Sequence, residues 1–234
     1  ETILKYIADT HILMRDQIAQ GKDILCEGAQ GTMLDVDHGT YPFVTSSNST
    51  SGGACTGLGI PPTKVDRVLG VIKAYTTRVG EGPFPTELSD GDGERLGKVG
   101  HEFGATTGRP RRCGWFDAVV ARYGIHLNGI DALILTKIDV LDGFKTIKAC
   151  TGYKYKGKIF PDMPADPEIV QNCEPVYTEY EGWSESTVGV QKLDQLPDNA
   201  RRYIDELTKL LETPFMMIST GPDREQTIQL DPLF

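Results

Sequence analysis

Two short segments of this chain carry groups that could recognise a purine base. The first is Thr136-Lys137-Ile138-Asp139, which follows the apolar run 132–135. A carboxylate at a strand end can accept two hydrogen bonds from guanine, from N1–H and from the exocyclic amine, whereas adenine presents no such donor pair on that edge. The aliphatic stem of Lys137 can cover the plane of the base. The alternative is a strand end with a solvated lysine and an aspartate helix cap.

The second segment is Ser219-Thr220-Gly221-Pro222, which also follows an apolar run. Backbone N–H groups in such a turn can donate to the O6 atom of guanine, and GTP-binding folds repeatedly combine these two kinds of turn. Taken alone, the segment is equally consistent with an ordinary turn built by Gly221 and Pro222. The two segments together favour a guanine site.

A third segment, residues 104–112, is rich in arginine although the chain as a whole is acidic. Guanidinium groups suit the bidentate binding of carboxylate or phosphate, and glycines allow the backbone to approach a ligand closely. The alternative is a solvated basic loop with surface salt bridges worth about 0–1 kcal/mol each. The residues that suggest anion binding are Gly104, Thr106, Thr107, Gly108, Arg109, Arg111 and Arg112.

A fourth segment, Glu27 to Thr32, places Gln30 between two small residues, where its amide could be presented to a ligand. Asp35, Asp37 and His38 follow it, and they could be metal ligands or structural hydrogen-bonding groups. We favour the structural role because no further ligand type stands nearby in the sequence. The other histidines, His11, His101 and His126, have no partners at suggestive spacing.

The chain lacks the glycine-rich motif that usually cradles nucleotide phosphates. The nearest candidate is Gly97-Lys98, but Asp92 stands where the first glycine is needed, and Val99 follows the lysine. The sequence therefore predicts guanine recognition without an obvious phosphate site.

Composition excludes several classes of protein. The chain has 24 Lys and Arg against 33 Asp and Glu, a net charge of −9, which argues against nucleic-acid binding as a partner function. Its five cysteines form no C-x-x-C pair, so we expect reduced thiols in a cytoplasmic protein. No apolar run approaches the length of a membrane span, so no membrane partner is expected.

Alternating strand and helix patterns predict an α/β sheet with ligands at the carboxyl ends of its strands. Helices are expected over 1–20, from 61–63 onward, and over 94–103, 115–123 and 196–212. Strands are expected over 23–27, 72–79, 131–136, 175–180 and 215–218, with a hairpin over 145–160 that turns near Lys156-Gly157. Residues 28–59 are expected to form a long functional loop.

Eight segments of the chain occur in a characteristic order: 27–32, 37–42, 44–48, 82–88, 102–109, 135–142, 182–187 and 219–224. In that order they resemble the adenylosuccinate synthetases over nearly the whole chain. The resemblance implies that residues 1–234 are the C-terminal part of a single domain of that family. The implied fold is an incomplete, P-loop-NTPase-like α/β fold with a mostly parallel sheet flanked by helices.

The resemblance implies GTP-dependent ligation of L-aspartate to IMP, which gives adenylosuccinate, GDP and phosphate through a 6-phosphoryl-IMP intermediate. It also implies Mg²⁺ as cofactor and a cytoplasmic homodimer. Gln30, Thr45 and Arg109 match residues that bind IMP, with Gln30 near the purine 6-position, where it supports catalysis. The aspartate loop corresponds to Ala105, Thr106, Thr107, Gly108, Arg109, Pro110 and Arg111. The GTP contacts correspond to Arg111, Lys137, Ile138, Asp139, Ser219, Thr220 and Gly221.

The resemblance also shows what this chain does not match. The family's phosphate loop, its catalytic aspartate, which is also a Mg²⁺ ligand, and its catalytic histidine lie in an N-terminal half with no counterpart here, so we assign no catalytic residue and no metal ligand. An arginine donated by the neighbouring subunit lies there too. Either the protein continues upstream of Glu1, or a second polypeptide completes the site, or the chain is a non-catalytic guanine-nucleotide-binding fragment. A GTPase switch is disfavoured because no phosphate loop of that class is found.

Overall fold

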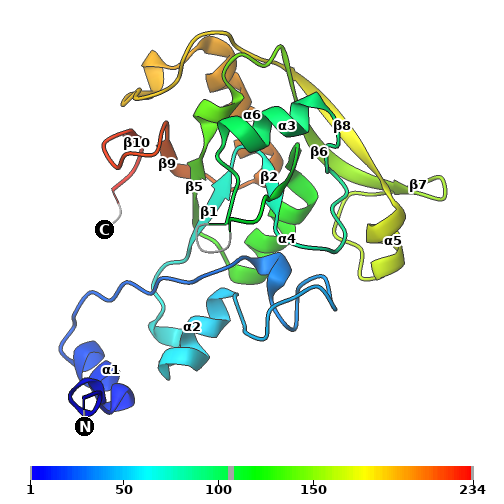
Figure 1. Cartoon of the computed structure of the whole chain (residues 1–234). Helices are drawn as coiled ribbons and strands as arrows, with labels where there is room; N and C mark the ends of the chain where they lie inside the picture. The colour runs from blue at the N-terminus through cyan, green and yellow to red at the C-terminus, as the bar shows by residue number, and fades with distance from the viewer. Residues whose placement is uncertain (1, 105–107, 233–234) are drawn as a thin grey trace. The chain divides into compact units, whose positions relative to one another are not determined.

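The computed structural model describes residues 2–104 and 108–232 (Figure 1). The chain divides into two compact units. The first comprises Glu1–Val68 with Leu127–Gly129, and the second comprises Leu69–His126 with Ile130–Phe234. That residues 1–234 form part of a single domain stays a prediction. None of the helices in these described ranges has both the length and the apolar composition needed to cross a membrane.

The second unit is built on a four-stranded sheet in the order β1-β5-β9-β10. Strands β1 (Leu69–Lys73), β5 (Ala132–Thr136) and β9 (Phe215–Ser219) run parallel, and β10 (Thr227–Gln229) pairs antiparallel with β9. Strands β5 and β9 are nearly continuous apolar runs, as is typical of parallel strands covered on both faces. The predicted α/β fold with a mostly parallel sheet flanked by helices is confirmed.

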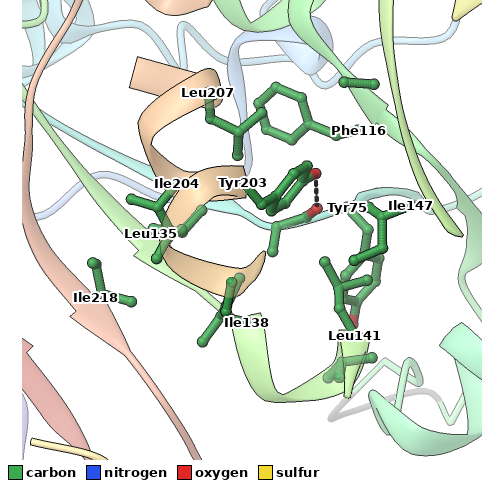
Figure 2. Close-up of a cluster of buried hydrophobic side chains, with 14 of the residues drawn as sticks. Tyr75, Phe116, Leu135, Ile138, Leu141, Ile147, Tyr203, Ile204, Leu207 and Ile218 are labelled. Carbon is green, nitrogen blue, oxygen red and sulfur yellow. Dashed lines mark hydrogen bonds between the residues drawn. The ribbon is translucent and has the colours of Figure 1, made fainter. Parts of the chain in front are cut away.

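Helix α6 supplies much of the core of this unit. It spans Asp198–Leu211 and confirms the helix expected over 196–212. Figure 2 shows Tyr203, Ile204 and Leu207 of this helix beside Leu135 of β5 and Ile218 of β9. The dashed line in Figure 2 is the hydrogen bond that the Tyr203 hydroxyl donates to the Ala74 carbonyl at 3.1 Å. The other helices of the second unit are α3 (Gly91–Val99), α4 (Ala118–Asn128, its last two residues in the first unit) and α5 (Pro167–Asn172).

Two further sheets, one of four strands and one of two, complete the second unit. Strand β6 pairs parallel with β4 and antiparallel with β7 and β8, while β2 pairs antiparallel with β3. The predicted hairpin is confirmed, and it turns at Lys156 and Gly157, whose φ angles of 48° and 79° suit a two-residue turn between twisted strands. The bounds are β2 (Thr76–Arg78), β3 (Arg112–Gly114), β4 (Phe116–Asp117), β6 (Thr146–Tyr155), β7 (Lys158–Phe160) and β8 (Glu174–Glu181).

Three elements of the second unit differ from expectation at their boundaries. The strand expected over 72–79 is two strands, β1 and β2, separated at 74–75. Helix α3 begins three residues before 94, because the Asp90 carboxylate accepts from two amides of its first turn. Helix α4 begins at Ala118 rather than at 115, because residues 112–117 belong to β3, β4 and the link between them.

The first unit departs further from expectation. Its α-helices in the described ranges are α1 (Thr10–Ala19) and α2 (Ser51–Leu58), so the helix expected over 1–20 is shorter, and α2 lies within the expected loop 28–59. The strand expected over 23–27 is wrong: this segment has no secondary structure in the described chain, and Leu25 is 82% exposed. The helix expected after 61–63 is a single 3₁₀ turn, Pro62–Lys64.

Asp117 is a buried carboxylate that joins two elements of the second unit. One of its oxygens accepts from the amides of Val119 and Val120 at 3.1 and 3.2 Å, which caps α4. The other oxygen accepts from the Tyr153 hydroxyl at 2.7 Å. Burial raises the pKa of Asp117 to about 6, although these hydrogen bonds oppose the rise.

The raised pKa of Asp117 predicts a specific pH dependence of stability. The Asp117 carboxyl binds its proton more tightly in the folded state than in the unfolded state. Its contribution to the free energy of unfolding is therefore most favourable below its ordinary pKa of 3.8, and this contribution is lost as the pH rises through about 6. The loss should be roughly 2–3 kcal/mol. Urea unfolding of the wild type and of Asp117→Asn between pH 4 and 7 measures it as a difference. A difference that is flat across this range would contradict the prediction.

Candidate functional site

The two predicted base-recognition turns lie at one edge of the central sheet. Strands β5 and β9 are parallel neighbours paired through Leu135 and Ile218, so their carboxyl ends meet at the same edge. Asp139 lies three residues beyond β5, and Gly221 lies two residues beyond β9. The fold therefore places the two turns side by side, as guanine recognition requires.

The Asp139 carboxylate is half-buried and accepts no hydrogen bond from another residue in the part of the chain that the structure describes. Burial raises its pKa, the Asp142 carboxylate raises it further, and Lys137 lowers it. Asp142 is occupied, because it accepts from Trp183 Nε1 at 2.7 Å and from the Thr187 amide and hydroxyl at 2.7 and 2.9 Å. The Asp139 carboxylate can therefore accept hydrogen bonds from a ligand. The Asp142 carboxylate instead joins the end of this turn to Trp183 and Thr187.

Lys137 and Ile138 orient this turn. Lys137 has a left-handed φ of 65°, which few residues other than glycine adopt. Its Nζ donates to the Gly100 carbonyl at 2.7 Å, so its stem extends from the end of β5 to the end of α3. The Ile138 side chain is fully buried in the core, which leaves only its backbone available to a ligand.

The second turn is held by side chains and leaves one amide open. Thr220 is buried; its hydroxyl donates to the Val190 carbonyl at 2.9 Å and its amide donates to the Gln226 carbonyl at 2.8 Å. The Ser219 hydroxyl donates to the Gly221 carbonyl at 2.9 Å. A Cβ at Gly221 would lie 2.2 Å from Gln226 Oε1, so any other residue here would displace the end of the Gln226 side chain. Among the described residues, no acceptor is paired with the Gly221 amide, which can donate to a base carbonyl.

Four residues form what we call the Glu102 cluster: Glu102, Lys73, Tyr75 and Arg111. The sequence patterns indicated Arg111 alone and did not predict that these four side chains meet. The Glu102 carboxylate accepts from Lys73 Nζ at 2.8 and 2.9 Å, from the Tyr75 hydroxyl at 2.5 Å and from Arg111 Nη1 at 2.8 Å. Burial alone would raise the pKa of Glu102, but these hydrogen bonds outweigh it and the pKa lies below its ordinary value. Glu102 is therefore an ionised, buried group at the carboxyl end of β1.

The arginine-rich loop is closed at its base by backbone hydrogen bonds. The Gly104 amide donates to the Arg109 carbonyl at 2.8 Å, and the Arg111 amide donates to the Glu102 carbonyl at 2.8 Å. Gly108 has a left-handed φ of 62°, which explains the glycine there. Ala105, Thr106 and Thr107, which are predicted aspartate-loop residues, lie outside the described residues.

The arginines that follow Arg109 hold structural partners in this structure. Arg111 contacts Glu102, as described above, and Pro110 pairs with Phe103 in an isolated bridge. The Arg112 guanidinium binds the Glu87 carboxylate, with Nε donating at 2.7 Å, and also donates to two loop carbonyls. The two arginine side chains are equally exposed, at 31%, and they differ in their partners: Arg112 binds Glu87 and two loop carbonyls, whereas Arg111 binds the buried Glu102.

In the first unit, Gln30 and Thr45 gather around Ser47. Gln30 has a left-handed φ of 64°, and its Oε1 accepts from the Ser47 hydroxyl at 3.5 Å. Thr45 Oγ1 lies 3.0 Å from Ser47 Oγ and accepts from the Ser47 amide at 3.2 Å. The two predicted IMP-binding side chains are therefore neighbours, although they are 15 positions apart in the sequence.

Asp35 is a structural acceptor rather than a metal ligand. It is fully buried and accepts from the amides of Asp37, His38, Ser49 and Thr50 at 2.7–3.2 Å. Burial alone would raise its pKa, but these four hydrogen bonds outweigh it and lower the pKa. Within the described ranges, no three His, Cys, Asp or Glu side chains come together as a metal site.

The weak phosphate-loop candidate lies in a helix. Gly97 and Lys98 belong to the last turn of α3, where their amides are part of the helix and its end. Their position agrees with rejecting the candidate on its sequence.

Taken together, the fold and these turns define an α/β protein whose two predicted base-recognition turns lie at the carboxyl edge of a mostly parallel sheet. The comparisons with known proteins identify the family within that class. The model of the adenylosuccinate synthetase family matches residues 1–228. The chain belongs to the adenylosuccinate synthetase family.

Individual relatives agree with the family match. The adenylosuccinate synthetase of Trichlorobacter lovleyi is 55% identical over 98% of this chain, and that of Geobacter sulfurreducens is 54% identical over 97%. The structure resembles the fully ligated adenylosuccinate synthetase from Plasmodium falciparum, with a TM-score of 0.94 at 43% identity over 97% of this chain. The chain spans about half the length of these proteins, namely 54%, 53% and 55%.

Proposed function

We propose that this chain supplies the guanine-recognition and aspartate-binding part of an enzyme that ligates L-aspartate to IMP. The observation that supports it is that Asp139 and Gly221 follow the neighbouring parallel strands β5 and β9 at one sheet edge, in a member of the adenylosuccinate synthetase family. Asp139 would accept from guanine N1–H and the exocyclic amine, while the Gly221 amide would donate to O6. This donor and acceptor pattern fits guanine and rejects adenine.

The proposed reaction has two steps. The γ-phosphoryl group of GTP passes to the 6-oxygen of IMP, which gives 6-phosphoryl-IMP and GDP. The aspartate amine then attacks C6, and phosphate leaves with the former 6-oxygen, which gives adenylosuccinate. Gln30 and Thr45 would contact IMP, and Arg109 would contact both aspartate and IMP. Bringing these anions together requires the compensating positive charge that Arg109 and Arg111 carry.

Magnesium would neutralise the phosphates of GTP in this reaction. The described residues of this chain offer no cluster of carboxylates to hold it, so its ligands would come from the rest of the enzyme. The cytoplasmic location and the homodimer also remain part of the proposal.

An alternative is a non-catalytic guanine-nucleotide-binding fragment that needs a separate N-terminal half for activity. The exposed position of β1 favours the view that this chain needs a further segment of polypeptide for activity. This strand pairs only with β5 in the described sheet, and Val71 in its middle is 73% exposed. An apolar residue on an edge strand is well suited to pair with, or lie under, a further segment.

Complementation tests both possibilities. The chain alone is expected to form no adenylosuccinate from IMP, aspartate and GTP, because it lacks a phosphate cradle. Adding the N-terminal part of the Trichlorobacter lovleyi relative, expressed separately, should restore product formation measured by chromatography. Val71→Lys is expected to abolish this restoration without changing the melting temperature of the chain, because its side chain is exposed. Failure to restore product with any N-terminal part of a relative would argue against the catalytic role.

A further inference from the structure

Arg111 and Glu102 form an ion pair whose two members differ in exposure. The Arg111 side chain is 31% exposed, whereas the Glu102 side chain is fully covered. We propose that Glu102 is a positioning residue: it is the counter-ion that holds Arg111 until an oxyanion, a phosphoryl or carboxylate group of a substrate, takes its place. The inference rests on the proposed function only for the identity of the substrate that supplies the oxyanion.

Glu102 keeps its partners when Arg111 leaves. Lys73 Nζ contacts both carboxylate oxygens, at 2.8 and 2.9 Å, and Tyr75 donates to one of them at 2.5 Å. Departure of the guanidinium therefore breaks one charged hydrogen bond and leaves the carboxylate ionised and paired. The large cost of an unpaired buried charge does not arise.

The Glu102 cluster carries an excess of positive charge. Lys73 and Arg111 give two cations against one carboxylate, and Lys137 lies close enough to affect them. Burial lowers the pKa of Lys73, and the charges of Arg111 and Lys137 lower it further, although Glu102 opposes the change. An incoming oxyanion would relieve this repulsion, so exchange of partners by Arg111 is favoured by the charges around it.

The backbone around the cluster is fixed independently of the side-chain pair. The Arg111 amide donates to the Glu102 carbonyl at 2.8 Å, a bond that the guanidinium does not influence. A Cβ at Gly100 would lie 2.2 Å from the Tyr75 hydroxyl, so glycine at this position allows Tyr75 to reach Glu102. Only the Arg111 side chain needs to move for the exchange.

Two variants of the whole chain should change oxyanion affinity in opposite directions. Glu102→Gln weakens the hold on Arg111 and should tighten binding about threefold to tenfold. Tyr75→Phe removes a donor without changing the charge, so Glu102 depends more on Arg111, and binding should weaken about twofold to threefold. Calorimetric titration with pyrophosphate and, separately, with L-aspartate measures both and identifies which oxyanion the site takes. A merely structural Glu102 would weaken binding in both variants.

The neighbouring pair of Arg112 and Glu87 provides a matched control. Glu87→Gln removes the partner of an arginine one position away and should leave oxyanion affinity unchanged. The gain in oxyanion affinity from Glu102→Gln should vanish in the double variant with Arg111→Met.

The inference is overturned if folded Glu102→Gln binds the probes no tighter than wild type does, or if the wild type binds neither probe. If Glu102→Gln does not fold, an unchanged affinity in Tyr75→Phe overturns it. Neither probe carries a purine base, so these titrations do not depend on guanine recognition, and the proposed function can fail independently of this inference.

Discussion

Replacing Asp139 with asparagine is expected to lower kcat/KM for GTP about a hundredfold in the complemented enzyme. The carboxylate would accept two charge-assisted hydrogen bonds from guanine, and asparagine offers one acceptor and one donor in their place. The asparagine donor would oppose the exocyclic amine of guanine, so selectivity should relax toward inosine triphosphate, which lacks that amine. Xanthosine triphosphate, which has a carbonyl at that position, should become a better substrate than GTP. Steady-state rates with the three triphosphates measure this shift.

Asp131→Asn is the control for this experiment, because Asp131 immediately precedes β5, at the end opposite to Asp139. It should leave the order of preference among the three triphosphates unchanged. Burial and Asp142 raise the pKa of Asp139, so GTP use by the wild type should decline as the pH falls through that raised value, where the carboxylate is protonated. An Asp139→Asn enzyme that still prefers GTP as strongly as the wild type would refute the base-recognition role.

The sequence was sufficient to predict the second unit where local pattern and tertiary burial agree. The apolar stripe of α6 and the apolar runs of β5 and β9 are long and unambiguous, and Lys156-Gly157 suits the turn of the β6–β7 hairpin. These same strands fix where Asp139 and Gly221 lie, so the neighbouring base-recognition turns could be anticipated from the order of elements alone.

The Glu102 cluster could not be anticipated in the same way. Lys73 and Tyr75 stand 29 and 27 positions before Glu102, and no periodic pattern links them. Their meeting depends on how β1 and the end of α3 pack, which is a tertiary property. The strand expected over 23–27 failed for a related reason. Its apolar residues have strand propensity, but a strand also needs a partner, and the described chain supplies none for Leu25.

Replacing Arg109 with leucine is expected to raise KM for L-aspartate about a hundredfold while changing KM for GTP little. A guanidinium can bind a carboxylate through two parallel hydrogen bonds, and leucine removes both hydrogen bonds and the charge. Arg109 lies where the loop closes, with its carbonyl accepting from the Gly104 amide, so its backbone stays anchored when the side chain changes. Arg109→Lys keeps the charge but loses the planar fork, and it should raise KM about tenfold. Initial rates at varied aspartate, with IMP and GTP saturating, measure both effects.

Arg112→Gln separates binding from folding in the same experiment. Its guanidinium holds Glu87 and two loop carbonyls, so the variant should lower the melting temperature and leave KM for aspartate unchanged. Arg109→Leu should raise KM for aspartate, because it removes the guanidinium that is expected to contact the substrate carboxylate. If Arg109→Leu shows wild-type aspartate kinetics, or if both variants raise KM for aspartate equally, then Arg109 does not bind the substrate carboxylate and the loop acts only through its structure.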